Sequence, residues 1–97
     1  MTTVDLVVKG GRVATAVDTF EADIGVRNGK IAALGHGLEA PRTLDAAGRL
    51  VLPGGVDSHC HIEQLSAAGV MNADSFETAT ASAARGGTTT VIPFAAQ

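Results

Sequence analysis

The triplet Pro53-Gly54-Gly55 divides the sequence into two parts with different hydrophobic patterns, and this division constrains the fold most. Before it, short apolar and β-branched runs alternate with glycine-containing turn signals, which is typical of a small all-β structure. After it, the pattern reads strand, loop, helix, strand. Because proline and paired glycines interrupt regular elements, we expect an all-β part over residues 1–52 and a second part over residues 53–97.

Three hairpins are predicted in the first part, each around a turn that contains glycine. Their strands are residues 6–9 and 12–15 around Gly10-Gly11, residues 22–26 and 30–34 around Asn28-Gly29, and residues 43–45 and 49–52 around Ala47-Gly48. Asn-Gly favours a type I′ turn because both central residues need a positive φ. His36 lies between two glycines, and we expect an exposed loop residue there.

The second part predicts one βαβ unit, the repeating element of parallel α/β proteins. Residues 56–62 read as a strand, residues 63–72 as a loop, and residues 88–94 as a second strand. Between them, residues 75–85 can form a helix that ends at Gly86-Gly87. Asp74 is the expected N-cap, with Glu77 three residues on as its capping-box partner.

Composition and charge exclude several classes of protein. The net charge is −3 and the pI is near 5.4, with no basic patch of the kind that nucleic-acid binders carry. No apolar run approaches the roughly 20 residues of a membrane span, and the first residues lack a signal-peptide pattern. The single cysteine, Cys60, rules out an intramolecular disulfide and fits a reducing compartment. We therefore expect a cytoplasmic protein that binds neither nucleic acid nor membranes.

The segment Asp57-Ser58-His59-Cys60-His61 is the candidate site. Side chains alternate along a strand, so Asp57, His59 and His61 should share one face while Cys60 packs on the other. Two imidazoles spaced in this way can bind one metal ion; zinc suits them, and so do iron, nickel and copper. Asp57 could orient one histidine or merely accept backbone hydrogen bonds. His-x-His alone is a weak motif, but ligands of parallel sheets collect at the carboxyl ends of strands.

This stretch also resembles a known family. Residues 51–61, Val-Leu-Pro-Gly-Gly-Val-Asp-Ser-His-Cys-His, are similar to the first barrel strand of the amidohydrolase superfamily. Residues 74–78 and 83–90 resemble the helix and second strand of its hydantoinase, dihydropyrimidinase and allantoinase branch, and residues 5–13 resemble its N-terminal sandwich strands. The similarity spans essentially the whole chain.

The resemblance implies a fold, a cofactor and a reaction. The fold would be part of a β-sandwich followed by the first βαβ unit of a TIM-type (β/α)₈ barrel. His59 and His61 would bind a divalent metal, with zinc favoured and two ions in a complete site. A metal-activated hydroxide would attack the carbonyl of a cyclic amide. The other ligands would lie beyond Gln97, so we expect this portion alone to be inactive and its parent to be a homotetramer.

Several alternatives stay open. Dihydroorotases carry an arginine where this chain has Glu63, which argues against an anionic substrate. Leu65 and Met71 could shape the substrate pocket or lie in a solvated loop. The parent could instead be an allantoinase, a deaminase or a non-catalytic dihydropyrimidinase-like scaffold. The retained His59 and His61 argue against the scaffold.

Overall fold

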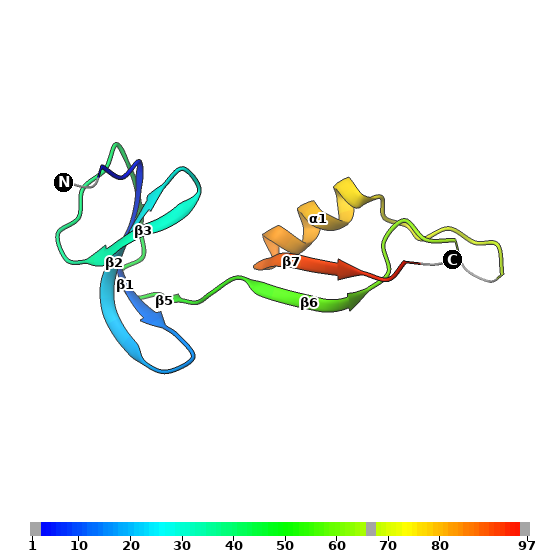
Figure 1. Cartoon of the computed structure of the whole chain (residues 1–97), viewed down its shortest axis with the longest axis horizontal. Helices are drawn as coiled ribbons and strands as arrows, with labels where there is room; N and C mark the ends of the chain where they lie inside the picture. The colour runs from blue at the N-terminus through cyan, green and yellow to red at the C-terminus, as the bar shows by residue number, and fades with distance from the viewer. Residues whose placement is uncertain (1–2, 66–67, 96–97) are drawn as a thin grey trace. The chain divides into compact units, whose positions relative to one another are not determined.

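The computed structural model describes residues 3–65 and 68–95 (Figure 1). The chain forms two compact units, Met1–Pro53 and Gly54–Gln97, and each is described here by itself.

The first unit contains one five-stranded sheet (Figure 1). Its strands are β1 (Leu6–Ala14), β2 (Thr19–Arg27), β3 (Lys30–Gly35), β4 (Arg42–Asp45) and β5 (Leu50–Val51). The order is β3-β2-β1-β4, with β5 also paired to β1. The β1–β2 and β2–β3 pairs are antiparallel, while β4 and β5 both run parallel to β1. The sequence-based prediction of an all-β part is confirmed for this unit.

The hairpin predicted at Gly10-Gly11 is wrong, because β1 runs straight through both glycines. The register with β2 jumps between Val8 and Gly11, which marks a β-bulge. Gly10 has a φ of +73°, a left-handed conformation that glycine adopts without steric cost. Gly11 is buried, and a Cβ there would lie 2.5 Å from the Val51 Cγ2 atom. The glycine pair therefore permits a bulge and a close approach of β5, not a chain reversal.

The hairpin predicted around Ala47-Gly48 is also wrong. Since β2 occupies one edge of β1, the opposite edge is available, and both short segments pair there: Leu6–Lys9 with β4, and Arg12 with Val13 against β5. The Asn28-Gly29 turn, by contrast, is confirmed, with φ angles of +52° and +75° between β2 and β3. Of the three turn signals, only Asn28-Gly29 thus joins two strands that pair with each other.

The core of the first unit is built from small aliphatic side chains. Val13, Ala22 and Ile24 form its buried cluster, and half-buried neighbours, including Phe20, pack against it. Ile31 and Leu34 on β3 stay largely exposed. They line an apolar groove of about 200 Å³ together with residues from β1, β2, β5 and the segment after β5.

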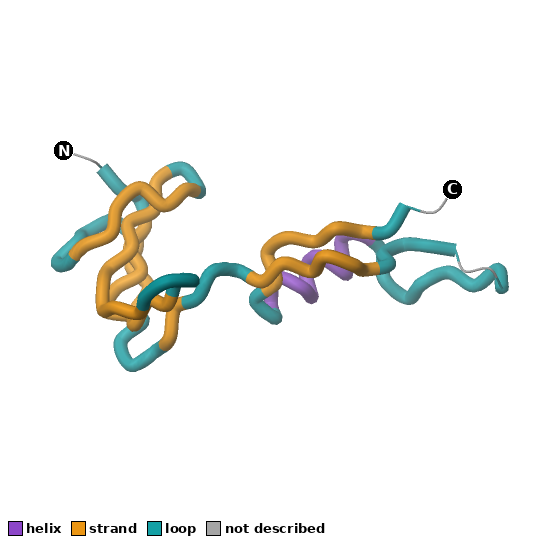
Figure 2. Tube along the Cα trace, turned by 60° about the horizontal axis from the view of Figure 1, so that its bottom comes forward, coloured by secondary structure: helices purple, strands orange, loops and turns teal. Residues whose placement is uncertain are grey.

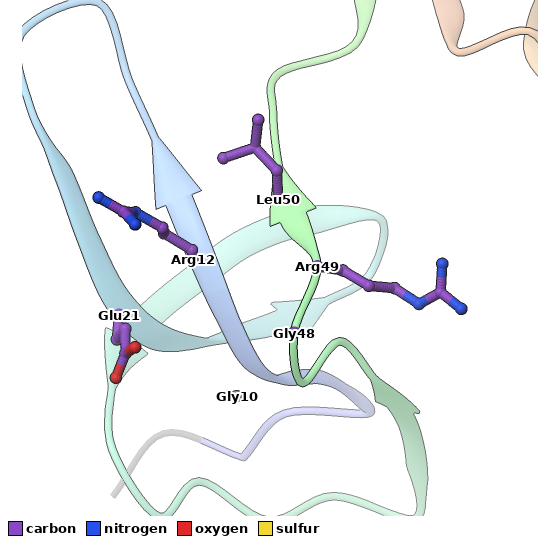
Figure 3. Close-up of a pocket in the computed structure, with 6 residues that line it drawn as sticks. All are labelled: Gly10, Arg12, Glu21, Gly48, Arg49 and Leu50. Carbon is purple, nitrogen blue, oxygen red and sulfur yellow. The ribbon is translucent and has the colours of Figure 1, made fainter.

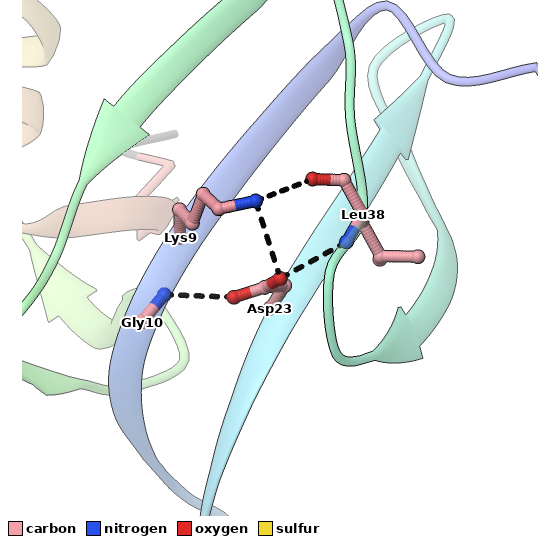
Figure 4. Close-up of polar contacts among 4 residues, drawn as sticks. All are labelled: Lys9, Gly10, Asp23 and Leu38. Atoms are coloured by element: carbon pink, nitrogen blue, oxygen red, sulfur yellow. Dashed lines mark hydrogen bonds and ion pairs between the residues drawn. The ribbon is translucent and has the colours of Figure 1, made fainter.

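A buried carboxylate ties the bulge to the loop after β3 (Figure 4). Asp23 on β2 is 5% exposed and accepts hydrogen bonds from the Gly10 amide at 2.8 Å and the Leu38 amide at 3.1 Å. The Lys9 ammonium lies 3.8 Å from the same carboxylate and donates to the Leu38 carbonyl at 2.8 Å. The hydrogen bond from Gly10 is the main cause that lowers the Asp23 pKa, and the Leu38 amide and the Lys9 charge lower it further.

The second unit is a strand, a helix and a second strand: β6 (Gly55–Cys60), α1 (Phe76–Arg85) and β7 (Thr88–Pro93). The two strands pair in parallel, and the helix lies along one side of them (Figure 2). Strand β6 is shorter than the predicted 56–62, so His61 and Ile62 follow its carboxyl end. The predicted loop over 63–72 contains one bridge, between Leu65 and Met71; its residues 66 and 67 lie outside the described part.

The predicted cap of α1 was displaced by one residue. Ser75, in an extended conformation, is the N-cap, and its Oγ accepts from the Thr78 amide. The Thr78 hydroxyl completes the capping box by accepting from the Ser75 amide, and Asp74 accepts from that hydroxyl instead of capping the helix. In the described ranges, no helix combines the length and the apolar character needed to cross a membrane.

The Asp23 network predicts a pH-dependent contribution to stability. Because the Asp23 pKa in the folded protein lies below the ordinary value of 3.8, its contribution is complete above that value and is lost as the pH falls through the lowered pKa. Chemical denaturation of the wild type and of Asp23→Asn should therefore show a difference that is largest near neutral pH and shrinks below about pH 4. A difference that stays constant down to pH 2 contradicts this role for the Asp23 charge.

The cap assignment is tested by replacing one serine. Ser75→Ala should lower the free energy of unfolding by about 1 kcal/mol, because the Thr78 amide loses its acceptor. Ser82→Ala, the same change inside the helix, is the matched control and should be neutral or slightly stabilising. Equal effects of the two changes in urea denaturation count against Ser75 as the cap.

Candidate metal centre

The two histidines of the predicted site lie together at the carboxyl end of β6. His59 is in the strand, and His61 is the first residue after it. Their ring centroids are 5.1 Å apart, and their Nε2 atoms are 3.2 Å apart. Both side chains are exposed, so the space in front of the two nitrogen atoms is accessible to an ion.

The spacing of these nitrogen atoms fits a shared metal ion. Two imidazole nitrogens bound at about 2.0–2.1 Å to a tetrahedral zinc ion stand about 3.3 Å apart. The His59 and His61 Nε2 atoms already stand at 3.2 Å. Neutral imidazole is also a donor that zinc, iron, nickel and copper accept. The pair can therefore act as a bidentate ligand with little rearrangement.

Phe94 supports the pair, and the sequence interpretation missed it. Its ring centroid lies 6.0 Å from that of His59 and 5.3 Å from that of His61, in both cases tilted. The Phe94 amide donates to the Cys60 carbonyl at 2.8 Å, which extends the β6–β7 pairing by one residue. The available signal was positional: in a parallel pair, the residue that ends the second strand lies beside the end of the first.

Asp57 makes a hydrogen bond to the backbone of its own strand. Its Oδ1 atom accepts a hydrogen bond from the His59 backbone amide at 3.2 Å. The carboxylate thus restrains the backbone of the strand beside the first histidine.

A loop on the other side of His61 supplies polar partners that the sequence interpretation also missed. The His61 Nδ1 atom is hydrogen-bonded to the Gln64 Oε1 atom. Asn72 donates from its side chain to the His61 carbonyl at 2.9 Å and accepts from the Gln64 amide at 3.1 Å. The His61 ring is therefore held from its Nδ1 side, which leaves its Nε2 side toward His59.

The other residues considered in the sequence analysis are near the histidine pair in the sequence, at the end of β6 and in the loop after it. Leu65 and Met71 are 58% and 53% exposed and form the bridge that narrows the loop. Cys60 is half-buried and forms no disulfide, and Ile62 is buried. Within residues 3–65 and 68–95, no group of three or more His, Cys, Asp or Glu side chains is placed to hold a metal ion. The described part of the chain thus brings together two candidate ligands, His59 and His61.

A depression in the surface of the first unit is not lined by metal-binding histidine or cysteine side chains (Figure 3). It measures about 350 Å³ and is lined by Gly10, Arg12, Glu21, Gly48, Arg49 and Leu50. Arg12 and Glu21 are opposite each other across β1 and β2. Its lining contains neither histidine nor cysteine, so the histidine pair remains the candidate centre.

Comparison with known proteins finds similarity to hydantoinases, dihydropyrimidinases and allantoinases. It is 48% identical to the D-hydantoinase of Ralstonia pickettii over 94 residues, which are 96% of this chain and 20% of that protein. It is 43% identical to the dihydropyrimidinase of Rattus norvegicus over 97 residues (93% of this chain, 18% of that protein). An allantoinase of Salmonella paratyphi B is 46% identical over 89 residues (91% and 19%).

The fold agrees with these similarities. A solved structure of D-hydantoinase superposes with a TM-score of 0.89 at 47% identity, covering 97% of this chain and 21% of that one. No family model matches the sequence. The chain spans about a fifth of the length of the relatives that it matches. Over nearly all of its residues, the chain is thus similar to proteins named D-hydantoinase and dihydropyrimidinase.

Proposed function

We propose that the chain is the metal-binding N-terminal part of a longer hydrolase that opens cyclic amides of the hydantoin or dihydropyrimidine type. The observation that carries the proposal is the convergence of the His59 and His61 Nε2 atoms, 3.2 Å apart, at the carboxyl end of β6. Its chemical direction comes from the similarity to D-hydantoinases and dihydropyrimidinases.

In this proposal the two units belong to different domains of the whole protein. Residues 1–52 form part of a β-sandwich, and residues 53–97 begin a TIM-type (β/α)₈ barrel. The parallel β6–β7 pair with its helix supports the second assignment. So does the exposure of apolar side chains such as Val56 and Ile92, which further strands and helices of a barrel would cover. The histidines stand at the strand end where such barrels carry their active sites.

His59 and His61 would hold a divalent metal ion, with zinc favoured and two ions in the complete site. An ion bound there would lower the pKa of water and polarise the amide carbonyl. The chain's own residues bind and orient: the imidazoles supply nitrogen ligands, and Phe94 and Gln64 restrict their rings. Two ligands alone leave the ion weakly held, so this segment is inactive without the rest of the protein.

The loop after β6 would contribute to substrate choice. Leu65 and Met71 would offer apolar surface to an uncharged ring, while the carboxylate of exposed Glu63 would repel an anionic one. The partner is thus a small cyclic amide, not nucleic acid or a membrane. The acidic composition and single cysteine are consistent with a cytoplasmic enzyme, which we propose to be a homotetramer.

Metal content tests the proposal directly. In the full-length protein, His59→Ala and His61→Ala should each reduce bound metal and lower kcat/KM for dihydrouracil or hydantoin by about 100-fold or more, because the ion that activates water is lost. His36→Ala, which changes an exposed histidine of the other unit, is the matched control and should change neither. The measurements are elemental analysis of purified protein and steady-state kinetics.

Other outcomes separate the alternatives. Metal retained at wild-type levels in both variants would overturn the assignment of His59 and His61. A metal-loaded wild type that hydrolyses allantoin but neither dihydrouracil nor hydantoin would favour an allantoinase, in line with the 46% identity to one. A wild type without metal and without hydrolytic activity would indicate a scaffold protein.

A further inference from the structure

We propose that Gln64 is a positioning residue that sets His61 in the tautomer whose Nε2 atom is free to bind metal. The inference rests on the proposed function, since it concerns the same metal centre. In this role, the Gln64 side chain contacts the proposed metal ligand His61 and does not contact the metal ion itself. The Gln64 amide oxygen would keep the proton of the neutral imidazole on Nδ1, which leaves the Nε2 lone pair directed at the ion.

The argument begins with the hydrogen bond itself. The atom that contacts the His61 Nδ1 is the Gln64 Oε1, and a carbonyl oxygen can only accept. Nδ1 must therefore carry the proton, and Nε2 must be unprotonated in the neutral ring. Since metal ions bind the unprotonated nitrogen, this contact prepares His61 as an Nε2 ligand before any ion arrives.

Gln64 can enforce this choice because its backbone is fixed. The Gln64 amide donates to the Asn72 Oδ1 atom at 3.1 Å, and the Asn72 amide donates to the Gln64 carbonyl at 3.1 Å. The Asn72 side chain also donates to the His61 carbonyl at 2.9 Å. Asn72 thus joins the two residues whose side chains meet, and it closes the loop 61–72 upon itself.

The chain direction after β6 serves the same contact. Ile62, the second residue after β6, is 8% exposed, and its buried side chain anchors the start of the loop. Glu63 then adopts a φ of +51°, a conformation that is uncommon for residues other than glycine. This turn brings Gln64 back to the His61 ring. A non-glycine residue in the left-handed region is consistent with a local structure that is held for a purpose.

The two histidines are consequently not equivalent before metal binds. If the His61 Nε2 has no proton, the contact of 3.2 Å between the two Nε2 atoms requires that the His59 Nε2 donates. An ion that enters must then displace only the His59 proton from Nε2. The structure therefore makes His61 the prepared ligand and His59 the one that changes tautomer.

The test is carried out on the full-length protein with Zn²⁺ as the probe. Gln64→Met keeps the size of the side chain but removes the acceptor, and it should weaken zinc binding by about 10–100-fold in chelator competition. The double variant Glu63→Gln/Gln64→Glu exchanges amide and carboxylate, so it restores an acceptor at position 64 without changing the net charge of the loop. It should bind zinc within about threefold of the wild type.

A second measurement needs no metal. In zinc-free protein labelled with ¹⁵N-histidine, with His61 assigned from its loss in His61→Ala, the wild type should show the proton on Nδ1 of His61. Gln64→Met should show a mixture of both tautomers, and the exchanged double variant should show the wild-type form. Thermal unfolding of all variants reports any general loss of structure.

Wild-type zinc affinity and an unchanged tautomer in Gln64→Met would overturn the proposal. So would a loss of affinity that the exchanged variant does not restore, because the glutamine would then serve the loop structure alone. If the wild type binds no zinc through His59 and His61, the proposed function fails, while the tautomer of zinc-free His61 still decides whether Gln64 sets that ring.

Discussion

The parallel pairing of β6 with β7 is the interaction on which the candidate site depends. It runs from Gly55 opposite Thr88 to Cys60 opposite Pro93, and the hydrogen bond from the Phe94 amide to the Cys60 carbonyl continues it. Close approach of the two segments requires glycine at its start, since a Cβ on Gly54 would lie 2.0 Å from the Thr89 Oγ1 atom. Because this register places Cys60 opposite Pro93, the carboxyl ends of the two strands lie side by side. Phe94, the next residue after β7, therefore lies beside the histidine rings.

The site is prepared without being buried. Exposed imidazoles keep their rotamer freedom unless neighbours remove it, and that ordering costs free energy. Here Phe94 packs against both rings, and Gln64 holds His61 through Nδ1. In the first unit, the buried carboxylate of Asp23 similarly accepts hydrogen bonds from two backbone amides. These bonds hold the bulge at Gly10 and the loop at Leu38 in place. In both units a few polar contacts order segments that a small aliphatic core cannot.

Predictions from the sequence succeeded where the deciding forces were local. Asn28-Gly29 forms the expected turn because its positive φ angles follow from the two residue types. The helix over 76–85 and its end at Gly86 also follow from nearby residues, although Ser75 took the cap that Asp74 was expected to form. The predicted strand pairings failed where a strand pairs with segments that are distant in the sequence. Gly10-Gly11 looked like a reversal, yet pairing with β2 on one edge and β4 and β5 on the other kept β1 continuous.

The sequence by itself determined the two-part organisation around Pro53 and the spacing of His59 and His61, because turn chemistry and strand periodicity act within a few residues. It also carried the family resemblance that comparison with known hydantoinases supports. Only the tertiary structure decided that the two Nε2 atoms meet, that the Phe94 ring lies beside both imidazoles, and that Gln64 reaches the His61 Nδ1. These contacts depend on a return strand and a folded loop, whose paths are set by hydrogen bonds between residues separated along the chain.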